Sequence, residues 1–364
     1  MIETARQAAQ LLRGEHQLLN STLHLQLEDF CLALRSNSRD FLQMMSRYFS
    51  HCLAEHCTAD ATVEAYDAAV QRLDIEWCDW AREPGKSGRK DSYHELDDGR
   101  LLNKVRTGML FLQSEPCRIA LGPCCELDNQ VINFINSQYM NRLQQQGWLI
   151  CHAAGLELNG AGLGIAGLSG GGKSTLMLAL MDNSQVNYVT NDRLFIKRDM
   201  SLIKARGIPK LPRINPGTIV HNPALHSLIE PAQRARLLEL PGRDLWHLED
   251  KHDVIISDVY GPGRMRNSMP LDVFVILNWS HDSTDDTQLK TVQLEQRSDL
   301  LPAIMKSPGP FYQFADGSFY QDNTPLDNSS YLETLRGVTI LEATGRINIP
   351  AIQQAIEQYV NAGG

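Results

Sequence analysis

One segment of the sequence, residues 167–174, constrains the fold more than any other. It reads Gly-Leu-Ser-Gly-Gly-Gly-Lys-Ser and fits the phosphate-binding pattern G-x-x-x-x-G-K-[ST] at every required position. The apolar residues 163–166 before it predict a strand, and residues 174–181 after it predict a buried helix. A glycine-rich turn at a helix N-terminus directs backbone N–H groups at phosphates. The pattern therefore predicts a nucleoside triphosphate site within an α/β arrangement.

Each residue type around this turn has an expected role. Lys173 reaches the β and γ phosphates, and the Ser174 hydroxyl, with help from Thr175, binds Mg²⁺. Asp192 lies just after the apolar segment 188–190, at a position where kinases usually have a second Mg²⁺ ligand. Asp258 is a rival candidate for that role. The residues expected to surround the phosphates are Gly167, Ser169, Gly170, Gly171 and Gly172.

Length and composition favour an ordinary soluble enzyme. The chain has 364 residues, enough for two domains, and its formal charge of -9 argues against a dedicated nucleic-acid binder. Apolar runs such as 273–277 are too short to span a membrane, and the first residues lack a secretion signal. Eight scattered cysteines do not resemble a disulfide framework. We therefore expect a cytoplasmic protein with reduced thiols and neither a membrane nor a nucleic-acid partner.

The chain changes in texture along its length. Apolar residues up to about residue 83 are spaced by three or four and predict a helical region. The polar segment 84–92 is the best candidate for a linker or loop, and residues 93–121 predict a small β layer. A helix is expected over 128–146, ended by Gly147. Strands and helices then alternate to a terminal helix over 350–362.

Three parts of the sequence together resemble a known family. They are residues 151–155 with Cys-His-Ala, the phosphate-binding segment, and Asn191-Asp192-Arg193. This combination resembles the HPr kinase/phosphorylase superfamily, most closely its HPr-kinase-related branch. The phosphate-binding segment also looks like that of phosphoenolpyruvate carboxykinase. The resemblance covers roughly residues 146–345 and implies a carboxykinase-like α/β core that uses ATP and Mg²⁺. It divides the chain into an unassigned helical and β region, 1–145, and a catalytic domain, 146–364.

The resemblance also implies roles for single residues. His152 matches the family's histidine near the transferred phosphate, Lys173 its loop lysine, and Ser174 its metal-binding hydroxyl. Asn191 departs from the family, which has two consecutive aspartates where this chain has Asn191-Asp192. An amide does not accept a proton at neutral pH, so the acid/base work falls to Asp192, to His152 or to neither. This departure argues against phosphorolysis more than against kinase activity.

Two later segments are candidates for the acceptor side. Residues 210–218 combine proline with basic groups and predict a fixed loop that presents cations beside the phosphates. Arg264 and Arg266 lie on a glycine-bearing loop and are candidates to clamp a γ-phosphate, the alternative being a solvated basic turn.

We expect a kinase that transfers the γ-phosphoryl group to a hydroxyl of a protein serine or of a small molecule. A carboxykinase-like reaction and a nucleotide-binding switch without catalysis are the alternatives. Homo-oligomerisation stays open.

Overall fold

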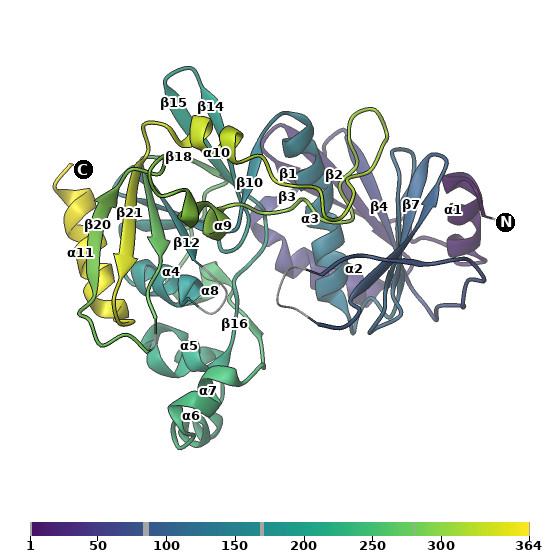
Figure 1. Ribbon diagram of the computed structural model, residues 1–364. Coiled ribbons are helices and arrows are strands. Elements are labelled where there is room, and N and C mark those ends of the chain that lie inside the picture. The colour runs from purple at the N-terminus through teal and green to yellow at the C-terminus, as the bar shows by residue number, and fades with distance from the viewer. Residues whose placement is uncertain (1, 83–86, 168–170, 281, 364) are drawn as a thin grey trace. The chain divides into compact units, whose positions relative to one another are not determined.

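The computed structural model describes residues 2–82, 87–167, 171–280 and 282–363. It is a mixed α/β structure whose chain separates into two compact units (Figure 1). Unit 1 comprises Met1–Gly147 and Ser307–Pro325, and unit 2 comprises Trp148–Lys306 and Leu326–Gly364. The expected second domain therefore begins two residues later than residue 146 and gives up an internal segment to the first unit. Each unit has its own sheets and its own core.

Unit 1 is built on a nine-stranded sheet with the strand order β3-β1-β2-β4-β9-β8-β7-β6-β5. The three strands β2, β4 and β9 run parallel, and the other neighbours pair antiparallel. The elements are α1 (Ala5–Arg13), β1 (Thr22–Leu27), β2 (Phe30–Ser36), α2 (Arg39–Tyr48), a 3-10 turn (Ser50–Cys52), β3 (Leu53–Ala54), β4 (Ala61–Asp67), β5 (Cys78–Asp79), β6 (Asp91–Leu96), β7 (Gly99–Lys104), β8 (Leu110–Gln113), β9 (Arg118–Gly122) and α3 (Asp128–Gln145).

Helices cover both faces of this sheet, as the alternation along β8 shows. Leu110 and Leu112 belong to the apolar cluster that contains the alanine-rich face of α1. Phe111 points to the opposite face, where its ring centroid lies 5.0 Å from that of Phe134 in α3. Side chains alternate between the faces of a strand, so one strand supplies both cores. The helix expected over 128–146 is confirmed as α3, and Gly147 follows it with a φ of +82°.

The helical prediction for residues up to 83 is wrong for most of that region. Residues 22–36 form the hairpin of β1 and β2, and β4 is a further strand. The leucines at 23, 25 and 27 are spaced by two, which suits one face of a strand and not a helix. A two-residue turn at Glu28 and Asp29 closes the hairpin, with Glu28 at a φ of +55°. Of the predicted loop 84–92, residues 84–86 lie outside the described residues, and β6 begins at Asp91.

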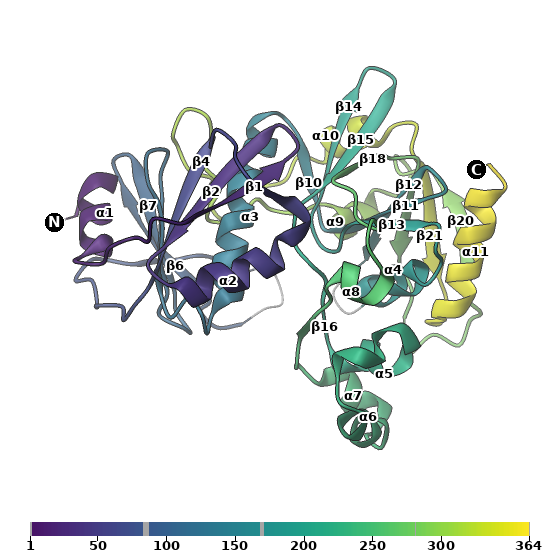
Figure 2. The same ribbon diagram turned by 180° about the vertical axis from the view of Figure 1, so that it is seen from behind.

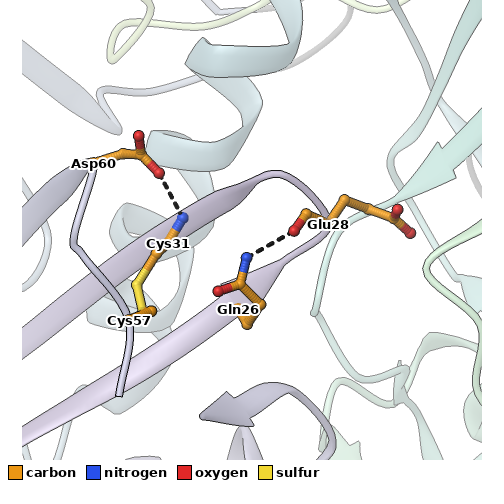
Figure 3. Close-up of a disulfide and its surroundings, with 5 residues drawn as sticks. All are labelled: Gln26, Glu28, Cys31, Cys57 and Asp60. Carbon is orange, nitrogen blue, oxygen red and sulfur yellow. Dashed lines mark hydrogen bonds between the residues drawn. A yellow bond between two sulfur atoms is a disulfide. The ribbon is translucent and has the colours of Figure 1, made fainter.

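A disulfide joins Cys31 in β2 to Cys57, and it corrects the expectation of reduced thiols for this pair (Figure 3). The backbone N–H of Cys31 also donates to Asp60 Oδ2 at 2.8 Å, so a second contact joins β2 to the residues just before β4. The other cysteines are free, including the adjacent Cys124 and Cys125. The disulfide bond ties the loop between β3 and β4 to β2.

The segment Ser307–Pro325 is bound into unit 1 through one buried arginine. The Arg100 guanidinium donates to the carbonyl oxygens of Pro310 and Tyr320, each at 3.0 Å. It forms a salt bridge with Glu95, and its Cζ lies 4.5 Å from the ring centroid of Phe319. Arg100 is completely buried, so its charge depends on these partners.

Unit 2 has a six-stranded mixed sheet with the order β13-β11-β12-β19-β21-β20 and a four-stranded sheet with the order β10-β14-β15-β18. Its first half contains β10 (Leu149–Cys151), β11 (Ala153–Leu158), β12 (Ala161–Gly167), α4 (Lys173–Met181), β13 (Val186–Thr190), β14 (Leu194–Asp199), β15 (Leu202–Gly207), β16 (Arg213–Ile214), α5 (Pro216–His221) and a 3-10 turn (Pro223–Leu228). Its second half contains α6 (Pro231–Leu238), α7 (Gly242–His247), β17 (His252–Asp253), α8 (Ile256–Tyr260), β18 (Ser268–Pro270), β19 (Val273–Leu277), β20 (Gln288–Val292), a 3-10 turn (Ser298–Leu300), α9 (Leu301–Ile304), α10 (Asn328–Leu335), β21 (Thr339–Thr344) and α11 (Ile349–Asn361).

The six-stranded sheet is covered differently on its two faces. α4 and α11 lie side by side on one face (Figure 2), where Gln353 Nε2 donates to the carbonyl of Ala179. The four-stranded sheet approaches the other face, and their shared core includes Phe274 and Leu194. A Cβ on Gly162 would lie 1.6 Å from the carbonyl oxygen of Pro270. Only glycine in β12 permits this approach, and the approach fixes the strand that leads into the phosphate-binding segment.

None of the described helices combines the length and the apolar character that a membrane crossing requires.

Candidate functional site

The predicted phosphate-binding segment joins β12 to α4 at the carboxyl end of three parallel strands. β12, β19 and β21 are parallel, with Gly167 opposite Leu277. Gly172 is the N-cap of α4, has a φ of +79°, and offers the helix no side-chain cap. Glycine at the N-cap supplies no capping side chain to the first N–H groups of α4, which suits an anion. Ser169 and Gly170, both predicted to contact phosphates, lie outside the described residues, as does Leu168.

Lys173 opens α4 and turns back toward the chain after β13. Its Nζ donates to the carbonyl oxygen of Asn191 at 3.0 Å and to Asp192 Oδ1 at 3.2 Å. Its side chain is 11% exposed. Burial lowers the pKa of the Lys173 ammonium, and the Asp192 carboxylate opposes this effect. A cation is thus held at the N-terminus of α4, where a phosphate would be its natural partner.

Asp192 gathers three basic side chains. His152 Nε2 lies 3.0 Å from Asp192 Oδ1, and Arg193 forms an ion pair with Oδ2. Lys173 is the third. His152 lies between β10 and β11 and belongs to neither strand. The His152 N–H donates to the carbonyl of Ile304 at 2.7 Å, and this irregular backbone aims the imidazole at Asp192.

These neighbours decide the charge of the Asp192 carboxyl. Burial alone would raise the pKa of Asp192, because it disfavours the ionised form. The Arg193 guanidinium, the hydrogen bond from His152 and the Lys173 ammonium outweigh burial and hold this pKa well below its usual range. In this arrangement Asp192 is an anion and a weak proton acceptor. Its basicity rises if one of the cations moves to another partner.

Asn191 occupies the position of the departure from the family's aspartate pair. Its carbonyl accepts from Lys173, and its side-chain Oδ1 is buried with no hydrogen-bond partner among the described residues. A buried acceptor without a donor costs about 1–3 kcal/mol. The amide oxygen is therefore available to a donor that arrives with a ligand.

The two hydroxyls after Lys173 lie in the first turn of α4. Thr175 Oγ1 shares a hydrogen bond of 2.9 Å with Thr218 Oγ1, which brings the start of α5 to this turn. No group of three or more His, Cys, Asp and Glu within the described ranges could hold a metal by itself. Mg²⁺ usually binds through one or two protein oxygens together with phosphates and water. Ser174 and Asp192 supply oxygens of that kind, so the residues fit a metal that arrives with a nucleotide.

Further cations surround the same carboxylate. Burial lowers the pKa of Lys210 to about 8, and the Asp192 carboxylate opposes this shift. Lys306 acts electrostatically on Lys173 in the same way that Arg193 does. Of the predicted cationic loop 210–218, Lys210 interacts electrostatically with Asp192, and most of the later residues belong to β16 and α5.

Arg264 does not reach this site. Its guanidinium donates to the carbonyls of Met181, Asn183 and Val186 at 2.9, 2.7 and 2.7 Å. These carbonyls follow the C-terminal end of α4, and nine residues of helix place that end roughly 13 Å from Lys173. The side chain completes the end of a helix, so the structure does not support the predicted phosphate clamp.

Arg266 and Asp258 are also displaced from their predicted roles. Arg266 Nη1 donates to the carbonyls of Gly263 and Met265, and its side chain is 46% exposed. Asp258, the rival candidate for the second Mg²⁺ ligand, is an exposed residue of the short helix α8. Asp192 is the carboxylate that lies beside Lys173.

Sequence reasoning missed one contact of the phosphate-binding segment. Trp279, two residues after β19, donates its indole N–H to the carbonyl of Gly171 at 2.8 Å. The contact joins residues 108 positions apart, so no local pattern indicates it. The parallel pairing of β12 with β19 was the signal that could have placed it.

Comparisons with known proteins add little to this geometry. No protein-family model matches the chain, and no curated protein matches it. Among solved structures, the Hpr(Ser) kinase/phosphatase from Coxiella burnetii is 13% identical, with 59% of this chain and 89% of that chain covered and a TM-score of 0.29. A likeness this distant carries no argument about activity.

Proposed function

We propose that this chain is an ATP- and Mg²⁺-dependent kinase that transfers the γ-phosphoryl group to a hydroxyl of a protein serine or a small molecule. One observation carries the proposal: Lys173, at the N-terminus of the helix after the glycine-rich turn, contacts Asp192 at 3.2 Å. A phosphate-binding cation and an acidic residue are the two parts that phosphoryl transfer requires of a protein. The family resemblance of the sequence supports the same proposal.

The contacts suggest how the site changes when nucleotide binds. Lys173 exchanges the Asn191 carbonyl and the Asp192 carboxylate for the β and γ phosphates, because their combined negative charge attracts an ammonium more strongly than one carboxylate does. Asp192 then loses the Lys173 ammonium as a partner and becomes more basic. It can hold the metal, or accept the proton of the acceptor hydroxyl while the hydroxyl oxygen bonds to the γ-phosphorus and ADP leaves. Mg²⁺ neutralises phosphate charge when it is bound.

Lys173→Ala tests the proposal. The variant should lose phosphoryl transfer and bind Mg²⁺-ATP at least ten-fold more weakly, since the removed cation neutralises phosphate charge. Calorimetry measures binding, and γ-labelled ATP measures transfer to water and to proteins encoded beside this gene. Lys290→Ala changes an exposed lysine of β20 and is the matched control. Equal ATP affinity in the wild type and Lys173→Ala would contradict the site.

The alternative is a nucleotide-binding switch that has lost catalysis. Asn191 favours it, because an amide stands where the family has a carboxylate. Asp192→Asn separates the two functions. In a kinase it should lower the rate by about 10² to 10⁴ if Asp192 is the proton acceptor. In a switch the wild type binds ATP tightly and transfers phosphate to no acceptor. The substitution then has no transfer rate to lower.

A further inference from the structure

We propose that Trp279 is a positioning residue that sets the direction of the Gly172 N–H toward the phosphates, an inference that rests on the proposed nucleotide site. The indole donates to the carbonyl of Gly171 at 2.8 Å, which fixes one side of the Gly171–Gly172 peptide. None of the described peptide bonds is cis. In a trans peptide the carbonyl oxygen and the following N–H point to opposite sides of the chain. The Gly172 N–H is therefore turned away from the indole.

The indole also closes the outer side of the turn. A Cβ on Gly172 would lie 3.8 Å from Trp279 Cζ2 and 3.5 Å from Ile349 Cδ1. The ring and the first residue of α11 therefore stand directly against the backbone of Gly172. With this side of Gly172 occupied, a ligand for the Gly172 N–H approaches from the other side of the peptide.

Hydrogen bonds on both sides of Trp279 hold its backbone in place, so the indole can orient the Gly171 carbonyl. The Asn278 N–H donates to the carbonyl of Ala343 at 2.9 Å, and the Ser280 N–H donates to that of Gly345 at 3.0 Å. Asn278 Nδ2 donates to the buried Glu342 at 2.7 Å, and Glu342 is in turn paired with Arg297. The parallel neighbour β21 thus fixes both flanks of Trp279. Two glycines leave the Gly171–Gly172 peptide free to rotate, and the hydrogen bond from Trp279 fixes its orientation.

The hydrogen bond from Trp279 to Gly171 should affect the affinity for the phosphates, whether or not a nucleotide base is attached to them. A net hydrogen bond of ordinary strength corresponds to about a five-fold change in a dissociation constant. Trp279→Phe keeps an aromatic ring and removes the N–H donor. It should weaken both ATP and inorganic tripolyphosphate by about five-fold. Trp246→Phe makes the same change at an exposed residue of α7 and should leave both affinities unchanged.

Calorimetry with tripolyphosphate and with ATP distinguishes the outcomes, with circular dichroism to confirm folding. Weakening of ATP but not of tripolyphosphate would mean that the ring contacts the base, and it would overturn the inference. Equal affinities in wild type and Trp279→Phe would overturn it too. A wild type that binds neither ligand refutes the nucleotide site itself, which is a separate failure.

A second variant and a spectroscopic readout separate a donor role of Trp279 from a general loss of stability in Trp279→Phe. Trp279→His keeps a ring N–H and should bind tripolyphosphate more tightly than Trp279→Phe does; equal loss in both counts against a donor role. Tryptophan emission should change when tripolyphosphate binds the wild type and Trp246→Phe. The same change in Trp279→Phe would show that the reporting ring is another one and would contradict the coupling of Trp279 to the ligand through the Gly171–Gly172 peptide.

Discussion

Replacement of Arg264 by alanine should destabilise unit 2 without affecting nucleotide binding. The guanidinium makes three hydrogen bonds of 2.7–2.9 Å to carbonyls that follow α4. At about 1 kcal/mol each, their loss amounts to about 3 kcal/mol. A domain of this size loses about 2–4 °C of melting temperature per kcal/mol, so a decrease of about 6–12 °C is expected. The dissociation constant for ATP should stay within two-fold of the wild type, because α4 separates Arg264 from Lys173.

Arg266→Ala is the matched control. Arg266 lies two residues further along the same loop and is exposed, so its removal should change stability by no more than about 0.5 kcal/mol. Differential scanning calorimetry measures both melting temperatures, and titration calorimetry with Mg²⁺-ATP measures both affinities. An Arg264→Ala protein that melts with the wild type but binds ATP much more weakly would refute this reasoning and restore the phosphate clamp.

Two predictions concern unit 1. Cys31→Ser should lower stability by about 3.5 kcal/mol in urea unfolding, because the disulfide closes a loop with a sequence separation of 26. The difference should disappear when a reductant is present, and a difference that persists would assign the effect to packing. Burial lowers the pKa of His51 from 6.5 to about 4, so the unfolded state binds the proton first and stability should fall as the pH decreases through this window. His51→Gln should remove that part of the pH dependence, and an unchanged pH profile would argue against it.

The parts of the fold that the sequence predicted are those with a strong local period. α3 was predictable because Val131, Ile135 and Tyr139 recur on one helical face, and all three are buried. The hairpin of β1 and β2 was misread because its leucines also satisfy a loose helical spacing. A strict alternation at 23, 25 and 27, followed by a polar turn, was the stronger signal.

The candidate site shows the same limit at the level of single side chains. The structure brings His152, Lys173 and Asp192 together as expected. The sequence predicts a phosphate contact for Arg264 because the residue lies on a glycine-bearing loop. The same sequence pattern also occurs where an arginine donates to the carbonyls at the end of a helix, as Arg264 does here. Trp279 could not be assigned, because its contact depends on which strands pair.

The return of Ser307–Pro325 to unit 1 has a consequence for how the protein can be made and divided. The chain passes from one unit to the other at residues 147, 306 and 325, so no single cut releases unit 1 intact. A fragment that ends at Gly147 would keep Arg100 but lack the carbonyls of Pro310 and Tyr320 that receive its charge. During synthesis unit 1 must likewise wait for most of the chain before its last segment is available. Its folding is therefore completed after much of unit 2 has been made, and a premature stop before residue 307 leaves Arg100 with Glu95 but without the two carbonyls.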